Sequence, residues 1–403
     1  MLRIFNTLGR TIQRFRPVNN RVVNIFTCGP SVYQRAHIGN FRTFLFEDIL
    51  VRYLEYSGYK VKRGMNLTDI EDKAFREAAE KGVPVKELTE THIDEFLREM
   101  ELLRIKIPDY LPRASDSVDQ AADLIRQLLD RGAAYWHGGN VYFDPLMYKG
   151  FGRLYGLDMS RWPKRKKRFH KDTYPGMQWN LGDFVLWHGY REGDLCWWDT
   201  PLGKGRPSWN IQDPSMISRY FDETLSIYCG GIDNLYRHHD YTLAILESLR
   251  PYPMARYWLH GEHLHVHGRK MSKSRGNIYY TDSLLGEGYD ARDIRFFLIY
   301  GRYRERLSFS DRAMRKVSSQ LQELRRSVAK IGAGARGSRA GDVGQRVRSA
   351  FSRRMDDDLD VRGAFDAVVT AVSKAEKEGI KPADAGSLIT ALREIDGVLR
   401  VIF

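Results

Sequence analysis

A strand, a turn, a helix and a second strand follow one another near the start of the sequence, and this order narrows the folds that the chain can adopt. The segment 22–27 is mostly apolar and β-branched, as in a buried strand, and a turn follows at 28–30. Apolar residues then recur at helical spacing over 41–56, and a second strand is expected at 59–67. Such a unit implies parallel strands with the helix as crossover. Parallel sheets bind ligands at the carboxyl ends of their strands, where the turn at 37–40 falls.

The rest of the sequence indicates an insertion in this sheet and a helical end. Residues 85–132 are mostly helical by pattern, and 133–144 read as a hairpin around two glycines. We therefore predict an α/β domain at 1–310 whose parallel sheet is interrupted by an insertion at about 85–200. An all-α bundle over 311–403 is predicted to follow it.

Charge and cysteine content limit the class of protein. The chain has 64 Lys and Arg residues against 51 Asp and Glu residues, which gives a net charge of +13. This charge favours a polyanionic partner, although a general contribution to solubility would also explain it. The odd number of widely spaced cysteines argues for a reducing compartment. No apolar run approaches the roughly 20 residues that span a bilayer, and no signal-peptide pattern is present. We therefore expect a cytoplasmic protein without a membrane partner.

The turn His37-Ile38-Gly39-Asn40 has the composition of an anion site. A helix N-terminus offers backbone N–H groups and the positive end of the helix dipole, and a glycine there allows a phosphate to approach closely. His37 can donate a hydrogen bond to a phosphate as charge develops on it. A string of four residues is weak evidence alone, because an ordinary capped turn has the same composition.

A second string, Lys270-Met271-Ser272-Lys273-Ser274, lies far downstream in a polar segment. Two lysines separated by two residues can hold the outer phosphates of ATP. Attack on the α-phosphate expels pyrophosphate, and lysine charge stabilises that leaving group. A solvated basic loop is the alternative interpretation, but the two strings together favour nucleotide binding.

These strings and several others, in the same order, resemble the class I aminoacyl-tRNA synthetases and most closely the cysteinyl-tRNA synthetases. The resemblance covers nearly the whole chain and rests on the stretches 27–33, 36–40, 66–73, 183–187, 205–209, 230–233 and 255–260. It implies a Rossmann-type catalytic domain split by a connective insertion, followed by a helical bundle. It also implies a ligase that forms an aminoacyl-adenylate from an amino acid and ATP, with Mg²⁺, and passes the aminoacyl group to a tRNA.

The resemblance assigns roles to individual residues. It implies catalytic roles for His37, Lys270 and Lys273, with Lys273 stabilising the transition state at the phosphates. Asn40 and these same three residues are expected to bind ATP. The amino-acid pocket is expected to contain Cys28, Ser31, Thr68, Trp209, Asp213, Asp233 and His238. Structural alternatives exist for several of them: a core position for Trp209, a strand position for Thr68 and a turn for Asp233.

Two positions that hold zinc in the cysteinyl-tRNA synthetases differ in this chain. In that family a zinc ion binds the substrate thiolate, and the resemblance places Cys28 and His238 at the first and third ligand positions. Asp213 and Thr242 occupy the second and fourth. Cys28, Asp213, His238 and the substrate would still make four zinc ligands, although a carboxylate makes the site less thiophilic. Two hypotheses stay open: zinc is retained, or hydrogen bonds select another amino acid.

The identity of the molecule that accepts the aminoacyl group also stays open at this point. A tRNA is favoured because phosphate contacts dominate RNA affinity. The helical region resembles the family's bundle that packs on the tRNA, but we expect it to lack the small anticodon-reading domain that is usual in the cysteinyl-tRNA synthetases. The alternatives are a small amine acceptor, as in a shorter branch of the family, and a non-catalytic RNA-binding paralogue. Basic residues that could contact RNA, or form a merely solvated face, are Arg161, Lys164, Arg165, Lys166, Lys167, Arg168, Lys171, Arg312, Arg315, Lys316, Arg325 and Arg326.

Overall fold

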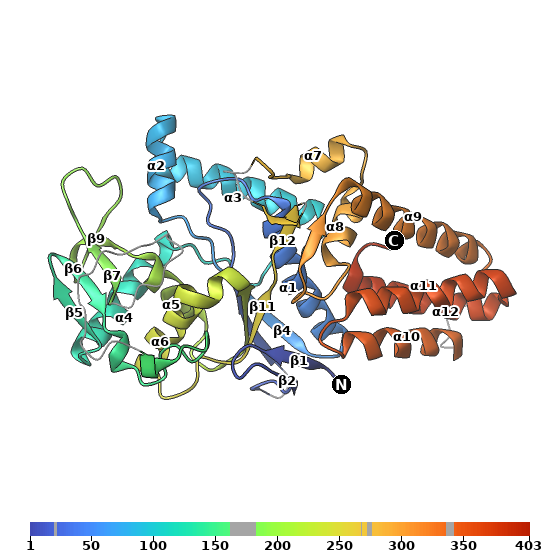
Figure 1. Cartoon of the computed structure of the whole chain (residues 1–403), viewed down its shortest axis with the longest axis horizontal. Coiled ribbons are helices and arrows are strands. Elements are labelled where there is room, and N and C mark those ends of the chain that lie inside the picture. The colour runs from blue at the N-terminus through green and yellow to red at the C-terminus, as the bar shows by residue number, and fades with distance from the viewer. Residues whose placement is uncertain (20–21, 162–182, 267, 272–275, 336–341) are drawn as a thin grey trace.

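Figure 1 shows the computed structural model of the chain, in which a central sheet lies between a second sheet at one end and a helical bundle at the other. The structure describes residues 1–19, 22–161, 183–266, 268–271, 276–335 and 342–403. Lys273 and residues 162–171 of the basic run lie outside the described residues, as do the side chains of Arg161 and Lys270. Within these ranges, no helix is long and apolar enough to cross a membrane.

The centre of the molecule is a parallel sheet of the predicted type. Its strands are β3 (Val22–Thr27), β4 (Lys60–Met65), β10 (Leu225–Gly231) and β11 (Ala255–Gly261), and their spatial order is β11-β10-β3-β4. Every pair is parallel. The chain adds β4 on one side of β3 and the later strands on the other side. The ligand crevice of such a sheet lies where the order reverses, which here is the carboxyl end of β3 and β10.

Helix α1 (Ile38–Tyr56) is the crossover between β3 and β4, as the sequence predicts. It begins earlier than the apolar periodicity indicates, because His37 and Asn40 cap its first turn. The His37 side chain accepts a hydrogen bond from the Asn40 backbone, and the Asn40 side chain accepts one from the His37 backbone. This capping box satisfies two N–H groups that a helix otherwise leaves without partners.

The chain between the two halves of the parallel sheet forms helices and a separate antiparallel sheet. The helices are α2 (Asp72–Lys81), α3 (Val85–Leu102) and α4 (Val118–Asp130), with short 3-10 turns at Ser115–Ser117, Pro145–Met147 and Met159–Arg161. The strands are β5 (Ala134–His137), β6 (Asn140–Phe143), β7 (Phe184–Gly189), β8 (Trp198–Thr200) and β9 (Gly203–Pro207), in the order β5-β6-β7-β9-β8. The hairpin predicted around Gly138 and Gly139 is confirmed, and both glycines have positive φ.

The elements around the second half of the parallel sheet carry much of the site. Helix α5 (Trp209–Tyr220) precedes β10, and the chain then passes through a 3-10 turn (Ile232–Asn234) and a kinked turn (Leu235–His239) into α6 (Asp240–Leu249). Tyr236 and Arg237 have non-helical backbone angles in this turn, and Arg237 has a φ of 68°. The remaining elements are β1 (Arg3–Asn6), β2 (Thr11–Arg14), β12 (Leu264–Val266), β13 (Arg269–Lys270), β14 (Leu307–Phe309), α7 (Thr281–Gly286) and α8 (Ala291–Ile299).

The last part of the chain is all helical, as predicted. It consists of α9 (Asp311–Ala333), α10 (Asp342–Met355), α11 (Val361–Glu378) and α12 (Pro382–Leu399). Leu321, Phe351, Val368 and Leu392 are buried side chains, one from each helix. They belong to the same apolar core as the buried face of α1, so the bundle and the parallel sheet are packed as one body. The fold class predicted from the sequence is therefore confirmed.

Candidate active site

A cavity of about 410 Å³, called here the small cavity, opens where the fold predicts a ligand crevice. It lies between the loop after β3, the start of α1 and the turn after β10. Its lining contains most of the residues that the sequence singles out: Cys28, Ser31, His37, Asn40, Trp209 and Asp233. Thr68, Asp213 and His238 do not line it, because each is at most 3% exposed and lies behind its wall.

One end of the small cavity is the N-terminus of α1, which suits an anion. Both His37 and Asn40 line the cavity at this end while they cap the helix. Gly39 is required by packing, since a Cβ there would stand 2.9 Å from the His37 ring. The glycine therefore lets the imidazole lie across the first turn, where the helix dipole favours a phosphate.

The second predicted string approaches the same end of the cavity. Strand β13 pairs with β12 in an antiparallel hairpin, and Met271, the next residue, is buried in the cavity wall. Its sulfur lies 3.7 Å from the point that a Cβ on Gly39 would occupy. The described part of the chain therefore brings the two strings into contact, while Lys273 follows outside the described residues.

At the other end of the small cavity, three buried side chains converge on one carboxylate oxygen. Tyr228 donates a hydrogen bond to Asp213 Oδ2 at 2.7 Å, His238 Nε2 lies 2.9 Å from the same oxygen, and Cys28 Sγ lies 3.5 Å from it. Burial opposes ionisation of this carboxyl, but the charge and hydrogen bond of His238 outweigh it and lower the pKa of Asp213. Asp213 is therefore an anion at neutral pH.

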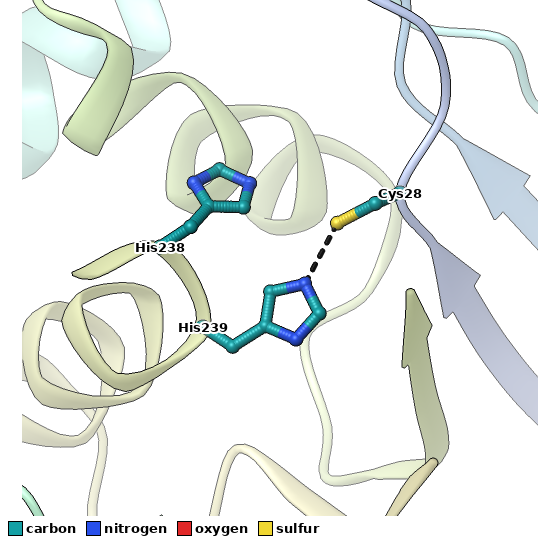
Figure 2. A group of neighbouring side chains, drawn as sticks. All are labelled: Cys28, His238 and His239. Atoms are coloured by element: carbon teal, nitrogen blue, oxygen red, sulfur yellow. Dashed lines mark hydrogen bonds between the residues drawn. The ribbon is translucent and has the colours of Figure 1, made fainter. Parts of the chain in front are cut away.

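A second row of polar side chains begins at Cys28. Its Sγ lies 2.9 Å from His239 Nε2 (Figure 2), His239 Nδ1 lies 2.8 Å from His260 Nε2, and His260 Nδ1 lies 2.8 Å from the Thr7 hydroxyl. Burial raises the pKa of Cys28, with the Asp213 charge adding to it, and burial lowers the pKa of His260 to about 3. This row therefore consists of a neutral thiol and neutral imidazoles, each held in place by its neighbour.

The sequence resembles the cysteinyl-tRNA synthetases, which bind a zinc ion at this place. The distances between the donor atoms at this end of the cavity can be compared with those between the ligands of one zinc. Cys28, His238 and His239 each offer a ligand atom, and these atoms lie within 4.8 Å of one another, so a metal could be held there. Ligands of one tetrahedral zinc stand about 3.3 Å apart for N and O and about 3.6 Å apart for N and S, given the usual bond lengths. The contacts of 2.9 Å from His238 to Asp213 and from Cys28 to His239 are shorter. These two contacts have the lengths of hydrogen bonds.

Thr242 and Trp209 complete this end of the site. Thr242 is fully buried, and its hydroxyl oxygen has no hydrogen-bond partner among the described residues. Trp209 stacks on the His238 ring with centroids 4.0 Å apart and separates it from the cavity. The neutral hydroxyl of Thr242 supplies no negative charge to a metal. Trp209 and the Cys28 thiol therefore line this end of the cavity, while His238 and Asp213 lie behind them.

Sequence analysis did not assign roles to Tyr228, His239 or His260. His239 stands beside His238 in the sequence, which is a visible signal, but the kinked turn Leu235–His239 decides that both rings lie near Cys28. Tyr228 lies inside an otherwise apolar strand and His260 near the end of another. Their polarity at buried strand positions is the only sequence signal, and it does not show which partner they meet.

Comparisons with known proteins now define the class. Residues 14–319 match the family model of the class I (C) tRNA synthetase catalytic domain. Among solved structures, Mycobacterium tuberculosis methionyl-tRNA synthetase with methionyl-adenylate has a TM-score of 0.64 at 17% identity, covering 95% of this chain and 90% of that chain. A LeuRS–tRNA–LeuAMS complex from Agrobacterium radiobacter has 0.67 at 13%, covering 96% and 85%. The fold is that of the class I aminoacyl-tRNA synthetases.

Full-length relatives narrow the class further. The cysteine–tRNA ligase of Chlamydia muridarum is 35% identical over 420 residues, which cover 99% of this chain and 87% of that protein. That of Chlamydia pneumoniae is 35% identical over 414 residues, covering 100% and 86%. The chain belongs to the cysteine–tRNA ligase family and is a class I ligase.

Proposed function

We propose that this ligase activates an amino acid with ATP in the small cavity and transfers the aminoacyl group to the 3′ end of a tRNA. The observation that carries the proposal is the small cavity itself. A capped helix N-terminus with His37 and Asn40 forms one end, and the Cys28 and Trp209 side chains form the other. A nucleotide phosphate suits the first end and an amino-acid side chain the second, so the two reactants meet between them.

The residues around the cavity suit adenylate formation. His37 donates a hydrogen bond to the phosphate as negative charge develops on it, and Lys270 and Lys273 stabilise the departing pyrophosphate. Mg²⁺ carried with ATP neutralises part of the phosphate charge. Asp233, which lines the same cavity, would bind the ammonium group of the substrate. This orientation would direct the substrate carboxylate toward the α-phosphate.

We propose further that hydrogen bonds, rather than a metal, organise recognition of the amino-acid side chain. The support is the network that holds Asp213 Oδ2 and the contact between Cys28 and His239, whose distances are those of hydrogen bonds. Buried polar groups reject ligands that leave them without partners. Cysteine, the substrate of the named relatives, is the first candidate, and another small polar amino acid is the second.

Exchange of pyrophosphate into ATP, screened over the common amino acids, tests the proposed function. We expect exchange that depends on one amino acid, and the identity of that amino acid reports what the altered pocket selects. Charging of unfractionated bacterial tRNA with the same amino acid then tests the acceptor. Formation of an aminoacyl product only with a small amine would contradict the tRNA step, and salt-dependent RNA binding without exchange would contradict the enzyme.

Metal content gives a separate prediction. We expect the purified protein to contain much less than one zinc per chain, and Asp213→Cys to raise the zinc content toward about one, because thiolate is a preferred zinc ligand. Inductively coupled plasma mass spectrometry measures both. Asp213→Cys combined with His238→Ala is the control, since it removes the second ligand and should bind less zinc. One zinc per chain in the unaltered protein would contradict the hydrogen-bond proposal.

The division of the chain into functional units is also a proposal. We propose that residues 1–310 form the catalytic unit, with its insertion at about 85–200, and that 311–403 form a unit that contacts the tRNA. The support is the arrangement in Figure 1, where the antiparallel sheet of the insertion and the bundle lie at opposite ends of the molecule. Arg315, Lys316 and Arg326 are among the basic residues on α9 that would supply phosphate contacts.

A further inference from the structure

A second cavity, larger than the first, lies beside it. This large cavity has a volume of about 770 Å³ and is bounded by α2, by strands β6, β7 and β9 of the insertion, and by the start of α5. No step of adenylate formation uses it. Its position between the catalytic sheet and the insertion makes it a candidate for the group that receives the aminoacyl unit.

The two cavities share part of their walls. Glu71, Lys73 and Trp209 line both of them. A reactant in the large cavity and an adenylate in the small cavity would therefore meet at these three side chains. Of the three, only Glu71 can accept a proton at neutral pH from an attacking group.

The side chain of Glu71 is held at this junction with unused hydrogen-bonding capacity. Glu71 is the N-cap residue of α2, but its carboxylate makes no capping hydrogen bond. The residue is only 8% exposed, and its Oε1 has no hydrogen-bond partner among the described residues. Its Oε2 has one long contact, 3.5 Å from the Ser31 hydroxyl. A buried carboxylate oxygen without a partner costs free energy, so a ligand that supplies a donor would be stabilised there.

The charges around Glu71 give it the chemistry of a base near neutral pH. Burial raises the pKa of Glu71 to about 7, although the nearby Lys73 opposes this shift. The other charged or titratable groups facing it are Asp72, Arg76 and Tyr33. A general base works best when its pKa is close to the working pH.

The remaining walls of the large cavity suit the end of an RNA strand. Arg76, Arg191, Arg206 and Arg237 line it, against the carboxylates of Asp72 and Asp194. Tyr142 also lines it, and an aromatic ring of this kind stacks on nucleobases. A small amine acceptor would use neither the cationic side chains nor the ring, so the lining favours a nucleotide.

We propose that the large cavity receives the 3′-terminal nucleoside of the acceptor RNA and that Glu71 takes the proton of its attacking hydroxyl. This proposal rests on the proposed function. The hydroxyl oxygen forms an ester bond with the carbonyl carbon of the aminoacyl-adenylate, and the bond from that carbon to the phosphate oxygen breaks. AMP leaves with the electron pair of the broken bond. The hydroxyl proton passes to Glu71 Oε1 and then to water.

Comparison of two half-reactions in Glu71→Gln tests the assignment. We expect single-turnover transfer to tRNA to fall about 10²-fold relative to pyrophosphate exchange, a typical loss for a general base. Trapping of the adenylate by hydroxylamine, which needs no base, should fall no more than exchange does. Glu80→Gln, on the exposed face of the same helix, is the matched control and should leave both half-reactions unchanged. Equal losses in exchange and transfer, or undiminished transfer, would overturn the role of Glu71.

The pH dependence of transfer gives a readout that a purely structural role would not change. Transfer by the unaltered enzyme should rise through the pKa of Glu71, because only the carboxylate accepts a proton, and Glu71→Gln should lose this inflection. Glu71→Asp, which retains a carboxylate, should keep the inflection at a lower rate.

Binding of RNA in the large cavity has its own test. Arg191→Ala should raise the KM for tRNA several-fold, and an unchanged KM would overturn the RNA assignment. Absence of any exchange in the unaltered protein would instead contradict the proposed function.

Discussion

Lys273→Ala is expected to lower amino-acid-dependent pyrophosphate exchange by about 10²- to 10³-fold, the loss typical of removing one preorganised group from a developing charge. Pyrophosphate gains negative charge as it leaves the α-phosphate, and a lysine ammonium would stabilise that charge. The described residue Met271 lines the small cavity beside the N-terminus of α1. The segment that follows it therefore starts at the phosphate end of the cavity.

The loss should appear in the chemical step and not in folding. We expect Lys273→Ala to keep the thermal unfolding temperature of the unaltered protein while its maximal exchange rate falls. Lys330→Ala is the matched control, because Lys330 is 74% exposed on α9 and pairs only with a bundle residue, Glu376. An exchange rate close to that of the control would remove Lys273 from the mechanism.

Asp48→Ala is expected to lower the free energy of unfolding by about 3–5 kcal/mol, the usual cost of leaving a buried charge without its partner. Asp48 Oδ2 lies 2.6 Å from Arg295 Nη2, and both side chains are fully buried. Arg295 also donates hydrogen bonds to the carbonyls of Leu399 and Leu103, at 2.7 and 2.9 Å. This one guanidinium therefore ties α1 and α8 to the ends of α12 and α3. Urea unfolding of both proteins measures the difference.

The same pair predicts a pH dependence. Burial opposes ionisation of Asp48, but Arg295 and Arg52 outweigh it and lower its pKa. A carboxyl with a lowered native pKa stabilises the fold above its unfolded pKa, which is about 3.9, and this stabilisation is lost as the pH falls through the native pKa. The difference between Asp48→Ala and the unaltered protein should therefore be full at neutral pH and shrink below about pH 4.

Glu55→Ala is the control for this prediction. Glu55 lies on the same helix and pairs with Lys106 at the surface, where both side chains are more than 30% exposed. Exposed ion pairs contribute about 0–1 kcal/mol, so Glu55→Ala should be close to neutral. A loss of 1 kcal/mol or less in Asp48→Ala would contradict the role assigned to the Arg295 contacts.

Much of the local structure could be predicted because it depends on neighbouring residues. The strand–helix–strand unit, the capped start of α1 and the hairpin at Gly138 follow from short-range periodicity and turn chemistry. The early start of α1 at Ile38 could not be read from the apolar pattern, because a side-chain cap, not an apolar face, sets it. The family stretches also located most residues that line the small cavity.

The sequence by itself determined the fold class, the family and the two strings that meet at the phosphate end of the site. Tertiary structure decided what stands at the other end. Cys28, Asp213 and His239 come from three separate segments of the chain, and the packing of α5 and of the kinked turn Leu235–His239 near the end of β3 brings them together. Whether Asp213 meets a metal or hydrogen-bond donors is set by distances of a few tenths of an ångström. The burial of Glu71 at the junction of two cavities is likewise a product of packing, because its helix position alone would make it an ordinary N-cap.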